Sequence, residues 1–157
     1  MKKIISIVLS VFVLITSFGI NSFATSNSSE TIYNSSYTYF EDGSYVITTI
    51  SEEISQARAS TKSGQKTSTF YDSDNVAQWS ATLKGTFTYS GSSATCTASS
   101  ITYTIYSSKL KVTSAQATKS GNKATGNVTA KRYLLGIPVQ TINKTITLTC
   151  SASGVLS

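Results

Sequence analysis

The sequence predicts an all-β protein, an antiparallel β-sandwich of about seven strands joined by short turns. Three observations predict it. Residues 79–89 alternate strictly between apolar and polar side chains, which is the period of a half-buried strand. Polar turns that contain glycine separate the apolar runs. Threonine and tyrosine, which favour strands, are abundant, whereas proline occurs once.

The N-terminus has the layout of a signal peptide. Lys2 and Lys3 precede an apolar stretch at 4–20, and Ser22-Phe23-Ala24 supplies small residues before a cleavage point. We therefore expect residues 1–24 to be removed after Ala24 and the protein to be secreted, extracellular or associated with the cell wall. A permanent membrane anchor is the alternative, but spanning needs about 20 apolar residues and nothing basic follows this stretch.

The segment 25–58 is acidic and differs from the rest of the chain. Residues 25–40 predict a loose arm or an added edge strand. Glu41-Asp42-Gly43 predicts a turn, and 44–50 predicts a strand. Residues 51–59 begin like a short helix and fit a linker equally well. We expect 25–58 to be a poorly structured segment or an added edge strand before a basic β-sandwich domain at 59–157.

The first strands of that domain are predicted at 65–71 and 79–89, the second with Trp79, Leu83 and Phe87 facing inward. After the Ser90-Gly91-Ser92 turn, the strand at 94–105 changes the parity of its apolar residues. This change predicts a β-bulge at Ser99-Ser100.

Further strands are predicted at 110–118, at 124–133 after the Ser120-Gly121-Asn122 turn, and from Ile142 to Cys150. In the last strand Lys144 breaks the apolar face, and we place it at a rim where its aliphatic stem covers apolar surface.

One short segment occurs twice. Residues 61–66 (TKSGQK) return as residues 118–123 (TKSGNK). We interpret both copies as the same hairpin turn, because glycine supplies the positive φ that such turns need. A duplicated half-domain is the alternative.

The two cysteines, Cys96 and Cys150, both lie in the exported part, where an even count predicts a disulfide. Such a bond would join two strands across the sheets. Its spacing is compatible with an immunoglobulin-like sandwich, our first choice, with another antiparallel sandwich or a small barrel second. Trp79 precedes both cysteines instead of lying between them, so the chain is not a true immunoglobulin domain.

Charge divides the chain. All seven acidic residues precede residue 75, and every charged side chain after it is basic. This asymmetry predicts an anionic partner, either a cell-wall polymer or a membrane surface, and no sequence-specific nucleic acid. The opposing interpretation is solubility, because lysines on outward strand faces discourage edge pairing. The candidate anion-binding residues are Lys109, Lys111, Lys119, Lys123, Lys131 and Arg132.

The apolar hairpin end at 134–139 supplies a second candidate surface. Beside Lys131 and Arg132, it could contact a membrane surface or a protein partner. The alternative is that its residues close one end of the core. The candidate tip residues are Leu134, Leu135, Ile137 and Val139.

No catalytic, metal or cofactor site is predicted. Histidine is absent, which excludes a Ser-His-Asp triad and a Cys-His pair. Glu41/Asp42 and Glu52/Glu53 are sequence neighbours, which a strand would point to opposite faces. Residues 72–75 resemble the start of a calcium loop but lack its glycine and final glutamate, so they predict a plain turn.

Several motifs resemble a family of uncharacterised small secreted β-proteins of Firmicutes, over roughly residue 57 to the C-terminus. They are Trp79 through Gly85, Phe87, Tyr89 and Gly91 to Cys96-Thr97, then Lys131-Arg132-Tyr133 with Leu135 to Val139, and finally Cys150-Ser151. The resemblance implies export and a β fold. The family has no established activity, so it implies no site residues.

Together these observations predict a non-catalytic extracellular or cell-wall-associated binding module for anionic polymers. The alternative is a proteolytically processed antimicrobial or toxin-like protein. In that case the acidic segment would neutralise the basic domain until cleavage at Arg58. The sequence does not determine an oligomeric state.

Overall fold

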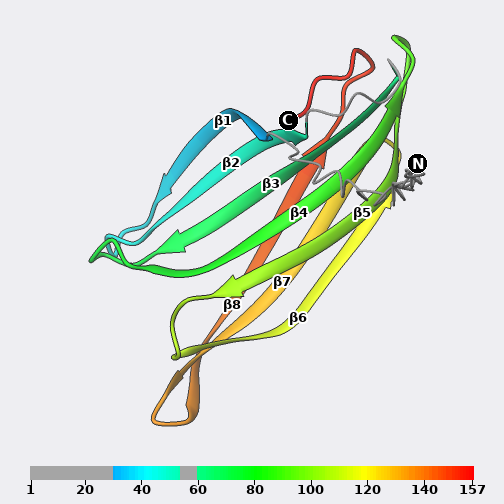
Figure 1. Cartoon of the computed structure of the whole chain (residues 1–157). Coiled ribbons are helices and arrows are strands. Elements are labelled where there is room, and N and C mark those ends of the chain that lie inside the picture. The colour runs from blue at the N-terminus through cyan, green and yellow to red at the C-terminus, as the bar shows by residue number, and fades with distance from the viewer. Residues whose placement is uncertain (1–29, 54–59) are drawn as a thin grey trace, which may run out of the picture.

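The computed structural model describes residues 30–53 and 60–157, and within these ranges every regular element is a strand (Figure 1). The predicted signal peptide at 1–24 and the predicted cleavage point at Arg58 lie outside the described residues. No helix that is long and apolar enough to cross a membrane occurs in the described ranges. The eight strands are β1 (Glu30–Tyr39), β2 (Tyr45–Glu53), β3 (Thr61–Tyr71), β4 (Ala77–Tyr89), β5 (Ala94–Ile105), β6 (Leu110–Ser120), β7 (Lys123–Leu134) and β8 (Ile137–Thr149).

The strands form two antiparallel sheets, which confirms the all-β prediction. The first sheet has the order β1-β2-β3-β4-β5 and the second β6-β7-β8, so every neighbour in a sheet is also a neighbour in the sequence. An immunoglobulin domain instead uses Greek-key connections that place non-consecutive strands side by side. The strand order therefore differs from the immunoglobulin-like arrangement expected from the cysteine spacing.

Most of the acidic segment belongs to the first sheet. β1 pairs with β2, and β2 pairs along its length with β3. The turn predicted at Glu41-Asp42-Gly43 joins β1 to β2, with Gly43 at a φ of +79°. Val46 and Ile50 of β2 are buried. The helix start considered at Ser51 is instead part of β2, and the rest of that predicted piece, 54–59, lies outside the described residues.

One core lies between the two sheets. It contains Leu83 and Phe87 of β4, Val128 of β7 and Leu148 of β8, all almost fully buried. Burying each such side chain contributes about 1.5–3 kcal/mol. The inward positions of 79–87, 124–130 and 146–150 are all buried, and Ser80 is the one outward position there that is buried too, so the two-residue alternation identified the core faces correctly.

The predicted bulge exists, but at a different residue. The β4–β5 register shifts so that Thr97 lies unpaired between Cys96 and Ala98. Ser99-Ser100, the predicted position, pairs regularly with β4. The Thr97 hydroxyl donates to the carbonyl oxygen of Thr86 at 3.1 Å, which holds the extra residue against β4. Several small or polar residues separate Cys96 from Ile101, so the sequence alone did not show where the inward positions change from even to odd numbers.

The two copies of the repeated segment fold differently. Residues 118–123 form the predicted turn between β6 and β7, with Gly121 at a φ of +53°. Residues 61–66 lie inside β3, so the turn interpretation is wrong for that copy. A Cβ on Gly64 would collide with the Leu156 side chain and lie 2.8 Å from the Ser51 carbonyl oxygen. Glycine is required there for close packing.

The predicted disulfide is absent. Cys96 and Cys150 are separate, buried thiols. Cys96 Sγ lies 3.2 Å from the carbonyl oxygen of Ala98, and Cys150 directly follows β8 and pairs with Leu156. Shared inward parity places both cysteines in the core, but parity alone does not bring two sulfurs to bonding distance. Burial raises the pKa of both thiols.

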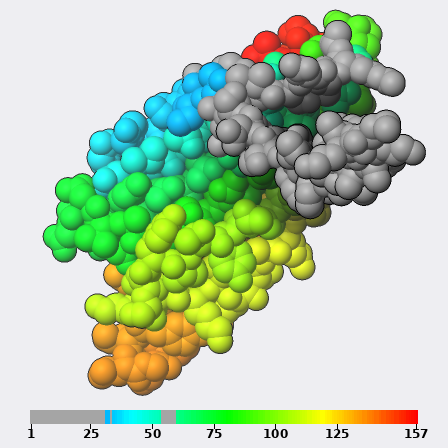
Figure 2. Space-filling view, viewed as in Figure 1, coloured from blue at the N-terminus to red at the C-terminus, as the bar shows by residue number. Residues whose placement is uncertain are grey.

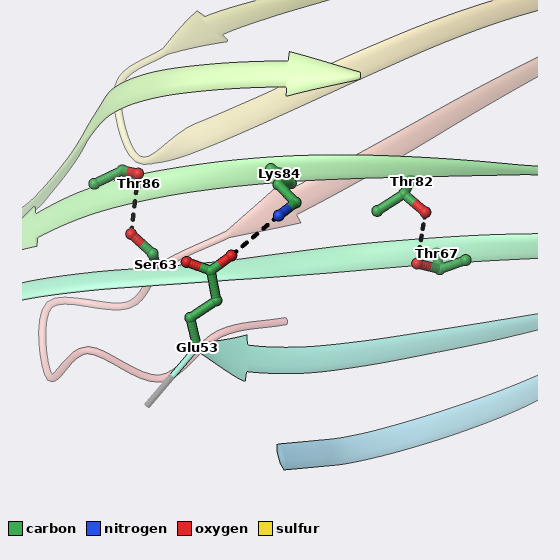
Figure 3. Close-up of polar contacts among 6 residues, drawn as sticks. All are labelled: Glu53, Ser63, Thr67, Thr82, Lys84 and Thr86. Carbon is green, nitrogen blue, oxygen red and sulfur yellow. Dashed lines mark hydrogen bonds and ion pairs between the residues drawn. The ribbon is translucent and has the colours of Figure 1, made fainter. Parts of the chain in front are cut away.

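Polar side chains link the strands on the outer face of the first sheet (Figure 3). Hydroxyl pairs join β3 to β4, and an ion pair joins β2 to β4, which explains the abundance of threonine and serine at outward positions. The pairs are Ser63–Thr86 at 3.0 Å, Thr67–Thr82 at 2.9 Å and Lys84–Glu53 at 3.1 Å.

Candidate functional site

The charge asymmetry of the sequence becomes an asymmetry between the two sheets. The three strands of the second sheet contain six lysine or arginine residues and no carboxylate, whereas all seven acidic residues lie at 30–74. The ion pairs in the described residues, Lys62–Glu52 at 2.9 Å and Lys84–Glu53 at 3.1 Å, belong to the first sheet. Within the described chain, the cations of the second sheet therefore have no carboxylate within ion-pair distance.

The six predicted anion-binding residues fall into two groups. Lys119 and Lys123 flank the β6–β7 turn, where Lys119 donates to the carbonyl oxygen of Thr97. The other four lie at the opposite end of β6 and β7, about 26 Å away along an extended strand. We call these four the basic end: Lys109, Lys111, Lys131 and Arg132.

Lys111 and Lys131 are direct cross-strand partners in the basic end. Lys109 lies beside them, because its carbonyl oxygen accepts the Tyr133 N–H at 2.7 Å. Like charges placed directly opposite each other in a sheet are destabilising, by up to about 1 kcal/mol. The sheet therefore holds together positive charges that repel one another.

The predicted interaction tip is exposed, so the alternative that it closes the core is wrong. It forms the turn between β7 and β8, which extends past the other strands (Figures 1 and 2). Leu135 is 95% exposed, and it and Gly136 have φ values of +50° and +82°, as in a two-residue type I′ turn. A bulky apolar residue at a positive φ is an outlier. The exposed tip residues are Leu134, Leu135, Ile137 and Val139.

A cleft of about 470 Å³ opens between the two sheets, at the end of the second sheet where the basic end and the tip lie. The first sheet and its turns contribute Phe70, Trp79 and Asp42 to the lining, and the second sheet contributes Arg132 and Lys144. These two cations occupy inward positions of β7 and β8, where Arg132 pairs with Gln140 and Lys144 pairs with the apolar Val128. Lys144 is half-buried, which confirms its predicted position at a rim.

Trp79, the only tryptophan in the sequence, lines this cleft and is 2% exposed. Its indole Nε1 is buried, and no hydrogen-bond acceptor reaches it within the described residues. A buried donor without a partner costs about 1–3 kcal/mol, and such groups are rare in folded proteins. Trp79 was expected to face the core, and the sequence contains no sign of its unpaired N–H.

The carboxylates of the cleft are already engaged in their own turns. Asp42 Oδ1 accepts the Ser44 hydroxyl at 2.6 Å and the Ser44 N–H at 3.0 Å. These hydrogen bonds lower the pKa of Asp42, and the positive charge of Arg132 adds a smaller effect. Asp72 accepts backbone N–H groups on Oδ1 and the Gln78 amide on Oδ2 at 2.6 Å.

Lys66 adds a third cation to the space between the sheets. It occupies an inward position of β3, between Gly64 and Ser68, and borders a second, smaller cleft of about 230 Å³. Burial lowers the pKa of Lys66, and the positive charge of Lys144 lowers it further. The sequence analysis missed Lys66, although its interruption of an inward row resembles the interruption at Lys144.

Comparison with known proteins gives no match among protein-family models, curated proteins or solved structures. The resemblance to secreted proteins of Firmicutes thus stays a prediction.

Proposed function

We propose that this protein is a secreted, non-catalytic binding module for an anionic extracellular polymer, and that the basic end makes the contact. The observation that supports this proposal is the direct pairing of Lys111 with Lys131, in a sheet that contains no carboxylate. A bound anion would relieve their repulsion, and the surrounding positive field would steer anions toward them. We also propose to class the fold as a β-sandwich, because two sheets share one core.

A polymer suits the basic end better than a single small anion does. Lys111 and Lys131 lie on neighbouring strands, which are about 5 Å apart. Lys109, just before β6, adds a third positive charge to this row. A row of positive charges matches a polymer that carries negative charges at regular intervals. Lys109 and Lys111 are exposed and Lys131 is half-buried, so affinity would come from several weak contacts at the surface.

The test is sedimentation of the secreted chain with purified cell walls, before and after chemical extraction of their anionic polymers. The variant is Lys111→Gln/Lys131→Gln, and the matched control is Lys119→Gln/Lys123→Gln, which removes the same charge from the other end of the same hairpin. We expect the first variant to lose about tenfold or more in affinity and the control to lose much less. Binding should also fall at about 0.5 M NaCl, because salt screens exposed charges.

Two outcomes would overturn the proposal. One is the absence of binding to untreated walls at low salt. The other is an equal loss in both double variants, which would show that net charge matters and the basic end does not.

A second candidate, contact with an anionic membrane surface, is favoured by the exposed tip. Leu135 and Ile137 present apolar surface beside Arg132. Sedimentation with vesicles of phosphatidylglycerol and with vesicles of phosphatidylcholine tests it. We expect binding to the anionic vesicles only, weakened by Leu135→Asn. Binding that is unchanged by this substitution would exclude the tip as the contact.

The processed toxin-like alternative fits the fold less well. Removal of the segment before Arg58 would take away β1 and β2, including the buried Val46 and Ile50. It would also expose the edge of β3. We therefore expect intact mass measurement of the culture supernatant to find a chain that begins at Thr25. A chain that begins just after Arg58 would restore the alternative.

A further inference from the structure

We infer that the cleft beside Trp79 binds one anionic sugar unit, a pyranose that carries a carboxylate or a phosphate. The inference rests on the proposed function for the origin of that unit, a residue or an end of the polymer. The cleft shares Arg132 with the basic end, and its other residues are distinct from Lys111 and Lys131.

Three donors of the cleft lining have no acceptor or counter-ion in the described chain. Trp79 Nε1 is a buried N–H that no group of the described chain accepts. Arg132 and Lys144 add cationic donors for which the described residues supply no ion pair. Asp42 and Asp72, the acidic residues of the lining, already accept hydrogen bonds from their own turns. A ligand that pairs with these three donors brings acceptor oxygens, and a negative charge on it would pair with Arg132 or Lys144.

The positive charge extends between the sheets. Lys66 and Lys144 lie close enough for the charge of one to disfavour protonation of the other, and burial disfavours the charged form of Lys66 further. An anion at this end of the cleft would favour protonated lysine at both positions. The end of the cleft at Lys144 is thus positively charged before any ligand enters.

The remaining wall is apolar and aromatic. Phe40 and Phe70 pack together with ring centroids 5.8 Å apart, and Ile142 lies on the opposite sheet wall. The volume of about 470 Å³ lies in the usual range for small-molecule sites. A ring with C–H faces, hydroxyl groups and one anionic substituent uses both walls, and a pyranose acid or a sugar phosphate has this composition.

The single tryptophan makes the test specific. Ligand in the cleft should change the fluorescence of Trp79 and shift the one indole N–H resonance in a proton–nitrogen NMR spectrum of the full secreted chain. The probes are glucuronic acid and glucose 6-phosphate, which distinguish a carboxylate from a phosphate source. Three controls accompany them. Glucose keeps the sugar ring without the charge, inorganic phosphate keeps the charge without the ring, and benzoate is an aromatic acid that is not a sugar.

We expect at least one anionic sugar to shift the indole resonance saturably, and glucose and phosphate alone to bind about tenfold more weakly or not at all. Lys144→Gln should weaken the response about tenfold, whereas Lys123→Gln, beside the distant β6–β7 turn, should leave it unchanged. Trp79→Phe keeps the aromatic packing and removes the N–H, so calorimetry should show a loss of about tenfold in affinity. The folding of each variant is checked by circular dichroism.

No indole shift with either anionic sugar would overturn the inference. So would a response to benzoate that equals or exceeds the response to the sugars. Failure of the wall-binding experiment with an intact indole shift would remove the polymer proposal and leave the sugar site. The reverse result would remove the sugar site and leave the polymer proposal.

Discussion

Lys66 of β3 and Lys144 of β8 bring two positive charges into the space between the sheets, and the pKa of Lys66 is lowered by burial and by Lys144. Neither lysine has an ion-pair partner in the described chain. In most proteins an inward strand position that is half-buried carries an apolar residue. The pair therefore has a cost in stability that the packing of the core does not require.

Replacing Lys66 by methionine should stabilise the protein at neutral pH. The folded-state pKa lies below the usual value of 10.5, so the protonated lysine is disfavoured in the folded state at every pH below that folded pKa. The penalty disappears as the pH rises from the folded pKa toward 10.5, where the lysine loses its proton. Because the side chain is partly exposed, we expect a gain of a few tenths to about 1 kcal/mol at pH 7.

Urea unfolding at pH 7 and near pH 10 measures this effect. The stability difference between Lys66→Met and the natural protein should narrow at the higher pH. Lys111→Met, on the exposed outer face, should show no such narrowing. A Lys66→Met protein that is less stable at pH 7 would contradict the prediction.

Asparagine at the two glycines of the repeated segment should have opposite consequences. Gly121→Asn should cost only a few tenths of a kcal/mol, because asparagine tolerates a positive φ and an added Cβ meets nothing within 4 Å. Gly64→Asn should cost about 2 kcal/mol or more, because a Cβ there meets Leu156 and the Ser51 carbonyl oxygen. Thermal unfolding of both variants tests this difference, and equal losses would argue against the close packing at Gly64.

Both cysteines should be free thiols that react slowly in the folded protein. Cys96 and Cys150 are buried, and burial raises the pKa of each, so little thiolate forms near pH 8. Alkylation without reductant should therefore label few thiols in the folded state and two per chain after unfolding in urea. Unfolded protein that takes up the label only after reduction would show a disulfide and contradict the structure.

Leu135→Asn should stabilise the β7–β8 hairpin. Leu135 occupies the first position of a type I′ turn at a φ of +50°, where asparagine followed by glycine is the preferred pair. We expect a gain of about 0.5–1 kcal/mol in the free energy of unfolding. Leu134→Asn, in the strand beside the turn, should give no gain. If Leu135→Asn destabilised the protein, the tip would have packing contacts that the structure does not show.

The alternation of side chains along single strands was predictable from the sequence. Trp79, Leu83, Phe87, Val128 and Leu148 are buried because inward and outward positions follow from the two-residue period of a strand, which is a local property. The acidic N-terminal part and the basic C-terminal part of the chain could also be read directly from the sequence. Their separation onto two sheets follows once each sheet is a run of consecutive strands.

The pairing of distant residues was not predictable in this way, and it determines the candidate site. The register that sets Lys111 opposite Lys131, the position of the bulge at Thr97 and the separation of the two cysteines depend on how strands align, which hydrophobic parity leaves open. The unpaired N–H of Trp79 and the proximity of Lys66 to Lys144 arise only where two sheets meet. Local alternation of the chain therefore determined which side chains face inward, and only the packing of one sheet on the other decided which of them share a cleft.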